Sequence, residues 1–211
     1  LVGSEMCIRD RPNVAQALQN KADFITKSIR EDGGDSFVAE MVKQIRAKYY
    51  KPNGEKKKLK NCDTDLFRVH DAGDLFSGAY INCWIRICDA LPDIRFWFPT
   101  REHVRVDQMP HLHQLALLPN VCLKPSALRL DEPAPKIKGL DAGTAVYTSE
   151  EKAVADGHYI CPATIHAYRL GKKAWRKVEK KERAKLSSCK GNGCKLCFIK
   201  GCNKGIAYMA H

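Results

Sequence analysis

A strand-helix-strand pattern between residues 66 and 98 constrains the fold more than any other feature of this sequence. Residues 66–70 form a short apolar run between turn residues, and residues 94–98 form a second run that is rich in aromatic side chains. Between them, Ser77 is placed to cap a helix whose apolar residues recur on one face. Because a helix of this kind usually connects two parallel strands, the pattern predicts an α/β fold with a parallel sheet.

Weaker signals extend this alternation in both directions. We expect helices at residues 14–32 and 37–50, the second capped by Asp35 or Ser36, and another helix near residues 107–118. Further strands are expected in NVCLKPS, TAVYTS and HYICPA. The sheet is predicted to be open or curled into part of a (β/α) barrel, and to occupy residues 13–160. Residues 161–211 are predicted to form a small Cys-rich C-terminal metal-binding lobe.

The first twelve residues, LVGSEMCIRDRP, look like the translation of a sequencing adapter. We therefore expect residues 1–12 to be an artefactual, disordered tail and exclude Cys7 as a ligand.

Polar residues follow three of the expected strands. In parallel α/β folds ligands bind at the carboxyl edge of the strands, so these residues predict a cofactor-binding rim. Gly73 would let a ligand approach the backbone closely, and Asp74 offers a carboxylate for an amine or hydroxyl. A capping and turn loop is the alternative. The predicted rim residues are His70, Asp71, Gly73, Asp74, Thr100, Arg101, Lys124 and Ser126.

Four cysteines at the C-terminal end have the spacing C-x4-C-x2-C-x4-C, with glycines between them. Two thiolates on one turn can bind a single zinc or iron centre, and glycines permit the tight turns that this requires. In a chain expected to be cytoplasmic, closely spaced members of a set of ten cysteines indicate metal ligands or redox thiols rather than a disulfide framework. The candidate ligands are Cys189, Cys194, Cys197 and Cys202, with Cys161 at a strand end and His211 as further candidates.

The net charge of +12 is concentrated in residues 51–60 and 171–185. Such stretches can contact nucleic acid, or they can be a solvated linker and a solvated helix face. No apolar run approaches 18 residues and no export signal is evident, so we expect a cytoplasmic protein without a membrane span.

The segments FRVHDAGDLFSGAYINCW, RFWFPTR, ICPAT, SSCKGNGCKLC and GIAYMAH together resemble the phage and prophage family Gene product 88. The resemblance extends over residues 14–211 and implies a phage protein in the cytoplasm of its host. Its pattern of Cys-Pro-Ala, a further Cys and a C-x2-C pair makes Cys161, Cys189, Cys194 and Cys197 the family's cysteines, with Cys202 and His211 in reserve. The family's upstream Cys-rich element is not found, which suggests truncation.

The order of elements also resembles radical S-adenosylmethionine enzymes, in which DAGD would take the place of the strand end that holds the methionine amine. This second resemblance implies an iron-sulfur enzyme that uses S-adenosylmethionine in nucleic-acid or nucleotide metabolism. The alternative is a non-catalytic, zinc-stabilised protein that binds nucleic acid or has an accessory role. Zinc and iron-sulfur clusters both accept four thiolates, so the spacing leaves the metal open.

Overall fold

The computed structural model describes residues 12–58, 65–70 and 74–210, with side chains from residue 15 onward. The α-helices are α2 (Pro12–Asp32), α3 (Asp35–Tyr49), α4 (Gly78–Asp89), α5 (Met109–Leu117), α6 (Glu150–Ala155), α7 (Pro162–Lys177) and α8 (Lys180–Leu186). The strands are β1 (Leu66–Arg68), β2 (Arg95–Thr100), β3 (Val121–Pro125), β4 (Thr144–Tyr147), β5 (Tyr159–Ile160) and β6 (Ile206–Met209). Short 3-10 helices are η1 (Glu102–Val104), η2 (Val106–Gln108) and η3 (Leu196–Phe198). The expected tail lies outside these residues apart from Pro12, which begins α2.

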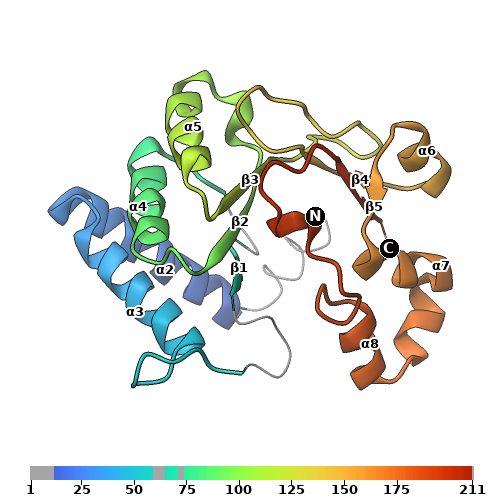
Figure 1. Ribbon diagram of the computed structural model, residues 1–211, viewed down its shortest axis with the longest axis horizontal. Helices are drawn as coiled ribbons and strands as arrows, with labels where there is room; N and C mark the ends of the chain where they lie inside the picture. The colour runs from blue at the N-terminus through green and yellow to red at the C-terminus, as the bar shows by residue number, and fades with distance from the viewer. Residues whose placement is uncertain (1–11, 59–64, 71–73, 211) are drawn as a thin grey trace.

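The strands form two three-stranded sheets with the orders β1-β2-β3 and β4-β6-β5, and every pairing is parallel. A parallel bridge between Ser126 and Thr144 joins the sheets. The strands follow one arc, with α3, α4 and α5 on its outer side and η3 on its inner side (Figure 1). In the described part of the chain β1 and β5 are the outer strands, so the sheet is open. The predicted α/β class with parallel strands is confirmed.

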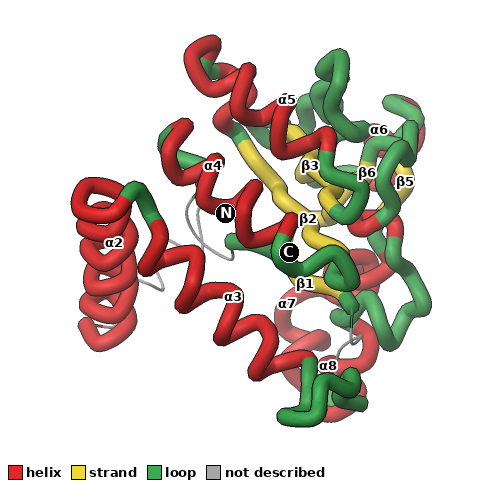
Figure 2. Tube along the Cα trace, turned by 60° about the vertical axis from the view of Figure 1, so that its left-hand side comes forward, coloured by secondary structure: helices red, strands yellow, loops and turns green. Residues whose placement is uncertain are grey.

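The main apolar core lies between α3, α4 and α5 and the outer face of the first sheet. Figure 2 shows α4 and α5 beside the strands that they cover. On β3, Val121 and Leu123 point into this core, while the alternating residues Cys122 and Lys124 belong to the inner face. All five residues of β3 are buried because both faces of the strand are covered.

Of the two helix N-caps expected from the sequence, the one at α4 is present and the one at α3 is not. The Ser77 cap of α4 is confirmed, since its side chain accepts a hydrogen bond from the Tyr80 N–H. The expected cap of α3 by Asp35 or Ser36 is wrong, because Gly34 precedes the helix with φ 91° and makes no side-chain cap. Asp32 instead accepts bonds from the backbone N–H groups of Gly34 and Ser36, at 3.0 and 3.1 Å.

The segment expected as a separate Cys-rich lobe is built into the sheet. Its last strand, β6, lies between β4 and β5 and pairs with both. The sequence pattern gave no strand there, because a four-residue apolar run does not reveal where it will pair. The cysteine-bearing chain between α8 and β6 therefore returns along the inner face of the arc. No helix in the described residues is long and apolar enough to cross a membrane.

Candidate functional site

Cys161 stands at the carboxyl end of β5, where the chain turns into α7. Its N–H donates to the Ala207 carbonyl of the neighbouring strand β6, at 2.8 Å. Pro162 follows as the first residue of α7, a position where the missing proline N–H costs no helical hydrogen bond. Sheet and helix together fix the Cys161 backbone, and its side chain is buried.

Cys189 and Cys194 lie between α8 and η3, and Cys197 lies within η3. The Cys194 N–H donates to the Cys189 carbonyl at 3.0 Å, which folds this segment back on itself. A Cβ atom at Gly191 would lie 2.0 Å from the Lys185 carbonyl oxygen, so the close approach requires glycine. The glycine is therefore part of what brings the first cysteine back towards the other two.

The structure places Cys194 and Cys197 near Cys161, and Cys189 near Cys197. Cys161 and Cys197 are buried in one apolar cluster with Trp97. Burial raises the pKa of the Cys161 thiol, and the nearby Cys194 raises it further. Burial likewise raises the pKa of Cys197 to about 12, with further contributions from Cys189 and Cys161.

The two reserve ligands differ from this set. The Cys202 sulfur lies 4.0 Å from the Lys204 carbonyl oxygen. His211 lies outside the described residues. Among the residues that the structure describes, no three His, Cys, Asp or Glu side chains are arranged closely enough to hold a metal. The four thiols thus converge on one region without forming a coordination shell.

Strands of both sheets surround Cys197 with hydrogen-bond donors. The Tyr208 hydroxyl lies 3.1 Å from the Cys197 sulfur. Lys124 is fully buried, donates to the Ala142 carbonyl at 3.0 Å, and lowers the pKa of Cys197 through its positive charge. The indole N–H of Trp97 is buried with no acceptor among the described residues. Buried donors normally have partners, so the Trp97 N–H is available to a negatively charged neighbour. The Lys124 ammonium has three hydrogens, and those that do not bond Ala142 are available as well.

Lys124 was predicted from sequence, whereas Trp97 and Tyr208 were missed. Both are aromatic residues on strands, where an apolar role is the usual interpretation. Strand alternation is the signal that separates Trp97 from the neighbouring phenylalanines on the other face. No comparable signal marks Tyr208, because β6 itself was not predicted.

At the predicted rim, Asp74 joins the loop after β1 to the end of β2. One carboxylate oxygen accepts from the Thr100 hydroxyl at 2.6 Å and from the Leu75 N–H at 2.7 Å. The other accepts from the Arg101 N–H at 2.7 Å. Both oxygens are thus used by the chain, which is the capping role that the sequence left open. Asp71 and Gly73 lie outside the described residues.

Two other rim residues connect the sheets. The Ser126 N–H donates to the Thr100 carbonyl at 2.7 Å, and the Ser126 hydroxyl lies 3.0 Å from that of Thr144. These bonds continue the pairing from β2 through β3 to β4. The Arg101 residue is exposed. Of the predicted rim residues that the structure describes, Asp74, Thr100 and Ser126 therefore hold strands and loops together at one edge.

His70 has an unusual environment at this edge. Its backbone has φ 61°, and its Nε2 lies 2.9 Å from the Tyr80 hydroxyl, while its buried Nδ1 has no partner among the described residues. Burial lowers the pKa of His70 from 6.5 to about 4, although Asp74 acts in the opposite direction. The imidazole is therefore neutral in the folded protein at neutral pH.

The lowered pKa of His70 predicts that the folded protein loses stability in acid. Because the folded pKa of about 4 lies below 6.5, the unfolded chain binds more protons between these values, and stability falls as pH falls. We expect His70 to lower the free energy of unfolding by about 2 kcal/mol between pH 7.5 and pH 5. Urea unfolding at both pH values should show that His70→Asn reduces the difference by this amount, since asparagine tolerates positive φ.

His113→Asn, at an exposed histidine, is the matched control and should leave the pH dependence unchanged. Equal pH dependence in wild type and His70→Asn would contradict the assignment to His70.

A family model described as Gene product 88 matches residues 5–200 of this chain. The Gene 88 protein of Mycobacterium phage L5 is 43% identical over 47 residues, and the Gene 88 protein of Mycobacterium phage D29 is 40% identical over 47 residues. Each match covers 20% of this chain and 20% of the relative, so the chain spans only a fifth of the length of these curated relatives. No solved structure matches the chain.

Proposed function

The chain belongs to the Gene product 88 family of phage proteins, and within that family we propose that it is a metal protein with a four-thiolate centre. The proposed ligands are Cys161, Cys189, Cys194 and Cys197. The observation that carries the proposal is the approach of Cys161, from a strand end, to Cys194 and Cys197, which lie more than 25 residues later and have Cys189 beside them.

The chemistry of the surrounding residues fits such a centre. Buried thiols without a counter-charge stay protonated, whereas a metal cation stabilises their thiolate form. Four thiolates around one divalent cation leave a net negative charge, which the buried ammonium of Lys124 would offset. The Tyr208 hydroxyl and the Trp97 indole would donate to the sulfurs as the outer contacts that orient metal ligands.

The position of the centre favours a structural role. It would fasten the end of β5 and the chain before β6 to the inner face of β2 and β3. Zinc with four thiolates has no open coordination position for a substrate, and sites of that kind contribute directly to folding stability. An iron-sulfur cluster held by the same four thiolates is the second form of this proposal.

A radical S-adenosylmethionine enzyme would be a catalytic form of this metal protein, and fewer observations support it than support a structural centre. The open, curved parallel sheet has the shape of part of a barrel, which favours it. However, the acid that would hold the methionine amine, Asp74, has both carboxylate oxygens engaged by Thr100, Leu75 and Arg101. We therefore propose a centre that stabilises the fold, and leave S-adenosylmethionine out of the proposed mechanism.

Metal analysis of the chain tests the proposal. The protein would be purified anaerobically, with metal content measured by mass spectrometry and the visible spectrum recorded before and after reconstitution with zinc or with iron and sulfide. We expect one stoichiometric centre per chain. Colourless protein with zinc identifies a zinc centre, and brown protein with iron and sulfide identifies a cluster. Protein that retains neither metal after both reconstitutions would contradict the proposal.

A further inference from the structure

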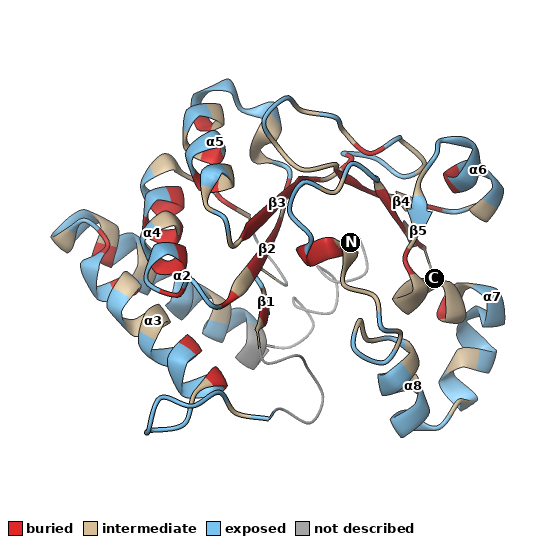
Figure 3. Cartoon of the chain, viewed as in Figure 1, coloured by how far each residue is buried: buried red, intermediate tan, exposed pale blue. Residues whose placement is uncertain are grey.

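Helices α7 and α8 form a hairpin that the rest of the protein hardly covers. Within residues 162–186 only Ala167 is fully buried, and Figure 3 shows α8 without buried residues. Gly171, with φ 72° and ψ 155°, interrupts α7, and the chain turns again at Val178 before α8 begins. Apolar packing therefore does not account for the hairpin, since its second half presents polar side chains on most sides.

The charge of this hairpin is high and unbalanced. Residues 171–185 contain eight Lys or Arg and two Glu. Elsewhere the described surface pairs many of its cations, as in Arg95 with Asp65 at 2.6 Å and Lys51 with Glu55 at 2.7 Å. Within the hairpin Arg169 pairs with Glu150, but none of the ion pairs found among the described residues includes a cation from residues 171–185. Residues 171–185 therefore carry a concentrated positive charge without an ion-pair partner among the described residues.

We propose that this basic hairpin binds the phosphate backbone of a nucleic acid. Exposed Lys and Arg side chains that are not held in ion pairs can contact phosphates without first breaking an internal interaction. Each contact releases counterions condensed on the nucleic acid, which gives favourable, salt-dependent binding. Neighbouring cations along two consecutive helices suit the regular spacing of phosphates on a strand.

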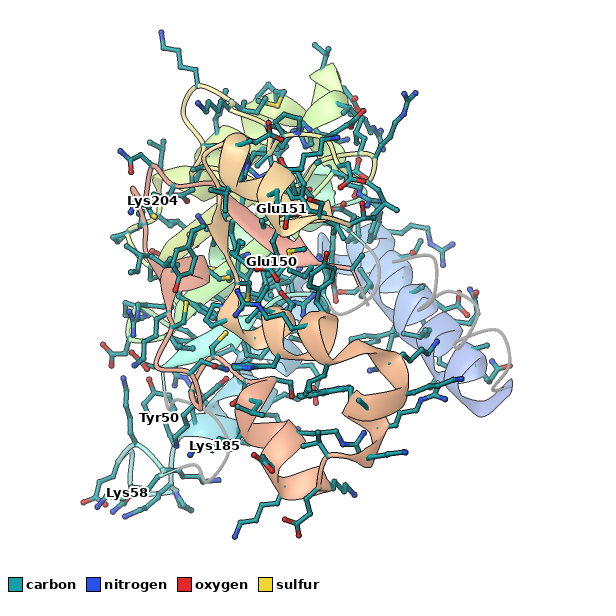
Figure 4. The ribbon with its side chains drawn as sticks, turned by 90° about the vertical axis from the view of Figure 1, so that its right-hand side faces the viewer. Tyr50, Lys58, Glu150, Glu151, Lys185 and Lys204 are labelled. Atoms are coloured by element: carbon teal, nitrogen blue, oxygen red, sulfur yellow. The ribbon has the colours of Figure 1, made fainter. Side chains whose placement is uncertain are left out.

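A second group of basic residues lies at the same end of the molecule as the hairpin. A groove of about 660 Å³ lies between the end of α3, the loop that follows it and the turn after α4. Arg46, Lys57 and the Glu55-paired Lys51 line it, together with Asp93. Lys185 lies at the same end of the molecule as Tyr50 and Lys58 (Figure 4), and Figure 1 places α8 and the loop after α3 along one edge. An extended polyanion can follow this edge from the hairpin towards the groove, whereas a short acidic peptide would occupy only part of it. Basic residues at two places along this end of the molecule favour nucleic acid as the partner.

This inference does not rest on the proposed metal centre, because its evidence is the charge and exposure of residues 171–185, none of which is a proposed ligand. The end of α8 is held by the Asn192 side-chain amide, which donates to the carbonyls of Leu186 and Ser188, at 2.6 and 2.9 Å. Nucleic-acid binding and metal content are therefore separate measurements with separate outcomes.

Fluorescence anisotropy with labelled single-stranded DNA, duplex DNA and RNA of one sequence tests the proposal across a range of salt concentrations. The test variant is Lys180→Glu/Lys181→Glu. It places acidic residues in the first turn of α8, where the helix dipole favours them, so the helix should survive. The control, Lys136→Glu/Lys138→Glu, makes the same change in net charge at two exposed lysines in the loop between β3 and β4.

We expect wild type to bind at least one of the three oligonucleotides with an affinity that falls as salt rises. The hairpin variant should bind about tenfold more weakly and show a salt slope reduced by about 2, as expected for the loss of two phosphate contacts. The control should bind within about threefold of wild type. The oligonucleotide bound most tightly identifies the type of nucleic acid.

Three results would overturn the proposal. One is the absence of binding to all three oligonucleotides at low salt. Another is an equal loss of affinity in the hairpin variant and the control, which would show that only net charge matters. The third is tighter binding to polyglutamate than to the oligonucleotides, which would identify an acidic polypeptide as the better partner.

Discussion

Cys161→Ser is expected to reduce bound metal to less than about a tenth of the wild-type content. A serine hydroxyl is a poor substitute for a thiolate, and a structural centre with four ligands requires all of them. Because a metal that binds only the folded chain stabilises it, we also expect the free energy of unfolding to fall by about 3 kcal/mol. Metal analysis and urea unfolding measure the two effects on the same preparation.

Cys202→Ser controls for the loss of a thiol, because Cys202 lies in the same segment but outside the proposed set. This variant should retain the metal. If Cys202→Ser lost the metal and Cys161→Ser kept it, the four clustered cysteines would form a self-contained site, and the assignment of Cys161 would be wrong.

Asp74→Ala is expected to lower the free energy of unfolding by about 3 kcal/mol, since it removes the charged acceptor for three donors. The Thr100 hydroxyl and the Arg101 N–H would lose the bonds that attach the loop after β1 to the end of β2. Urea unfolding at neutral pH provides the measurement.

Asp74→Asn is the matched variant, because it keeps the shape and one acceptor oxygen and should lose about half as much stability. A change below about 0.5 kcal/mol in Asp74→Ala would show that the carboxylate is not needed to hold the edge together. Asp74 would then be available to a ligand, and the rim would again be a candidate cofactor-binding site.

The main features of the α/β fold could be predicted from sequence because they depend on local patterns. The apolar face of α4 and the Ser77 cap follow from residue spacing alone, and β2 follows from its aromatic run. The start of α3 was misassigned because a turn through two glycines with positive φ does not need the side-chain cap that the sequence offered. The strand β6 was missed because its place depends on pairing with β4 and β5, which are distant in the sequence.

The candidate centre shows the same division between local and long-range information. The spacing of Cys189, Cys194 and Cys197 pointed to thiolate ligands without any knowledge of the fold. Cys161 joined them through a resemblance to the family, since nothing in its own neighbourhood indicates which cysteines it approaches. The roles of Trp97 and Tyr208 could not be predicted, because side chains from two separate strands meet around Cys197 only in the folded chain.

Residue patterns alone were enough to predict helices α2 to α5, most strands, the class of the sheet, the clustered thiols and the basic segments, but not helices α6 and α7. The predicted properties depend on residue type and on spacing within a few turns of chain. The fold was needed to show that the C-terminal segment returns into the sheet, that Lys124 lies buried beside Cys197, and that Asp74 is bound by its own chain. Those outcomes depend on contacts between residues far apart in sequence, which parallel pairing and the burial of apolar surface select together.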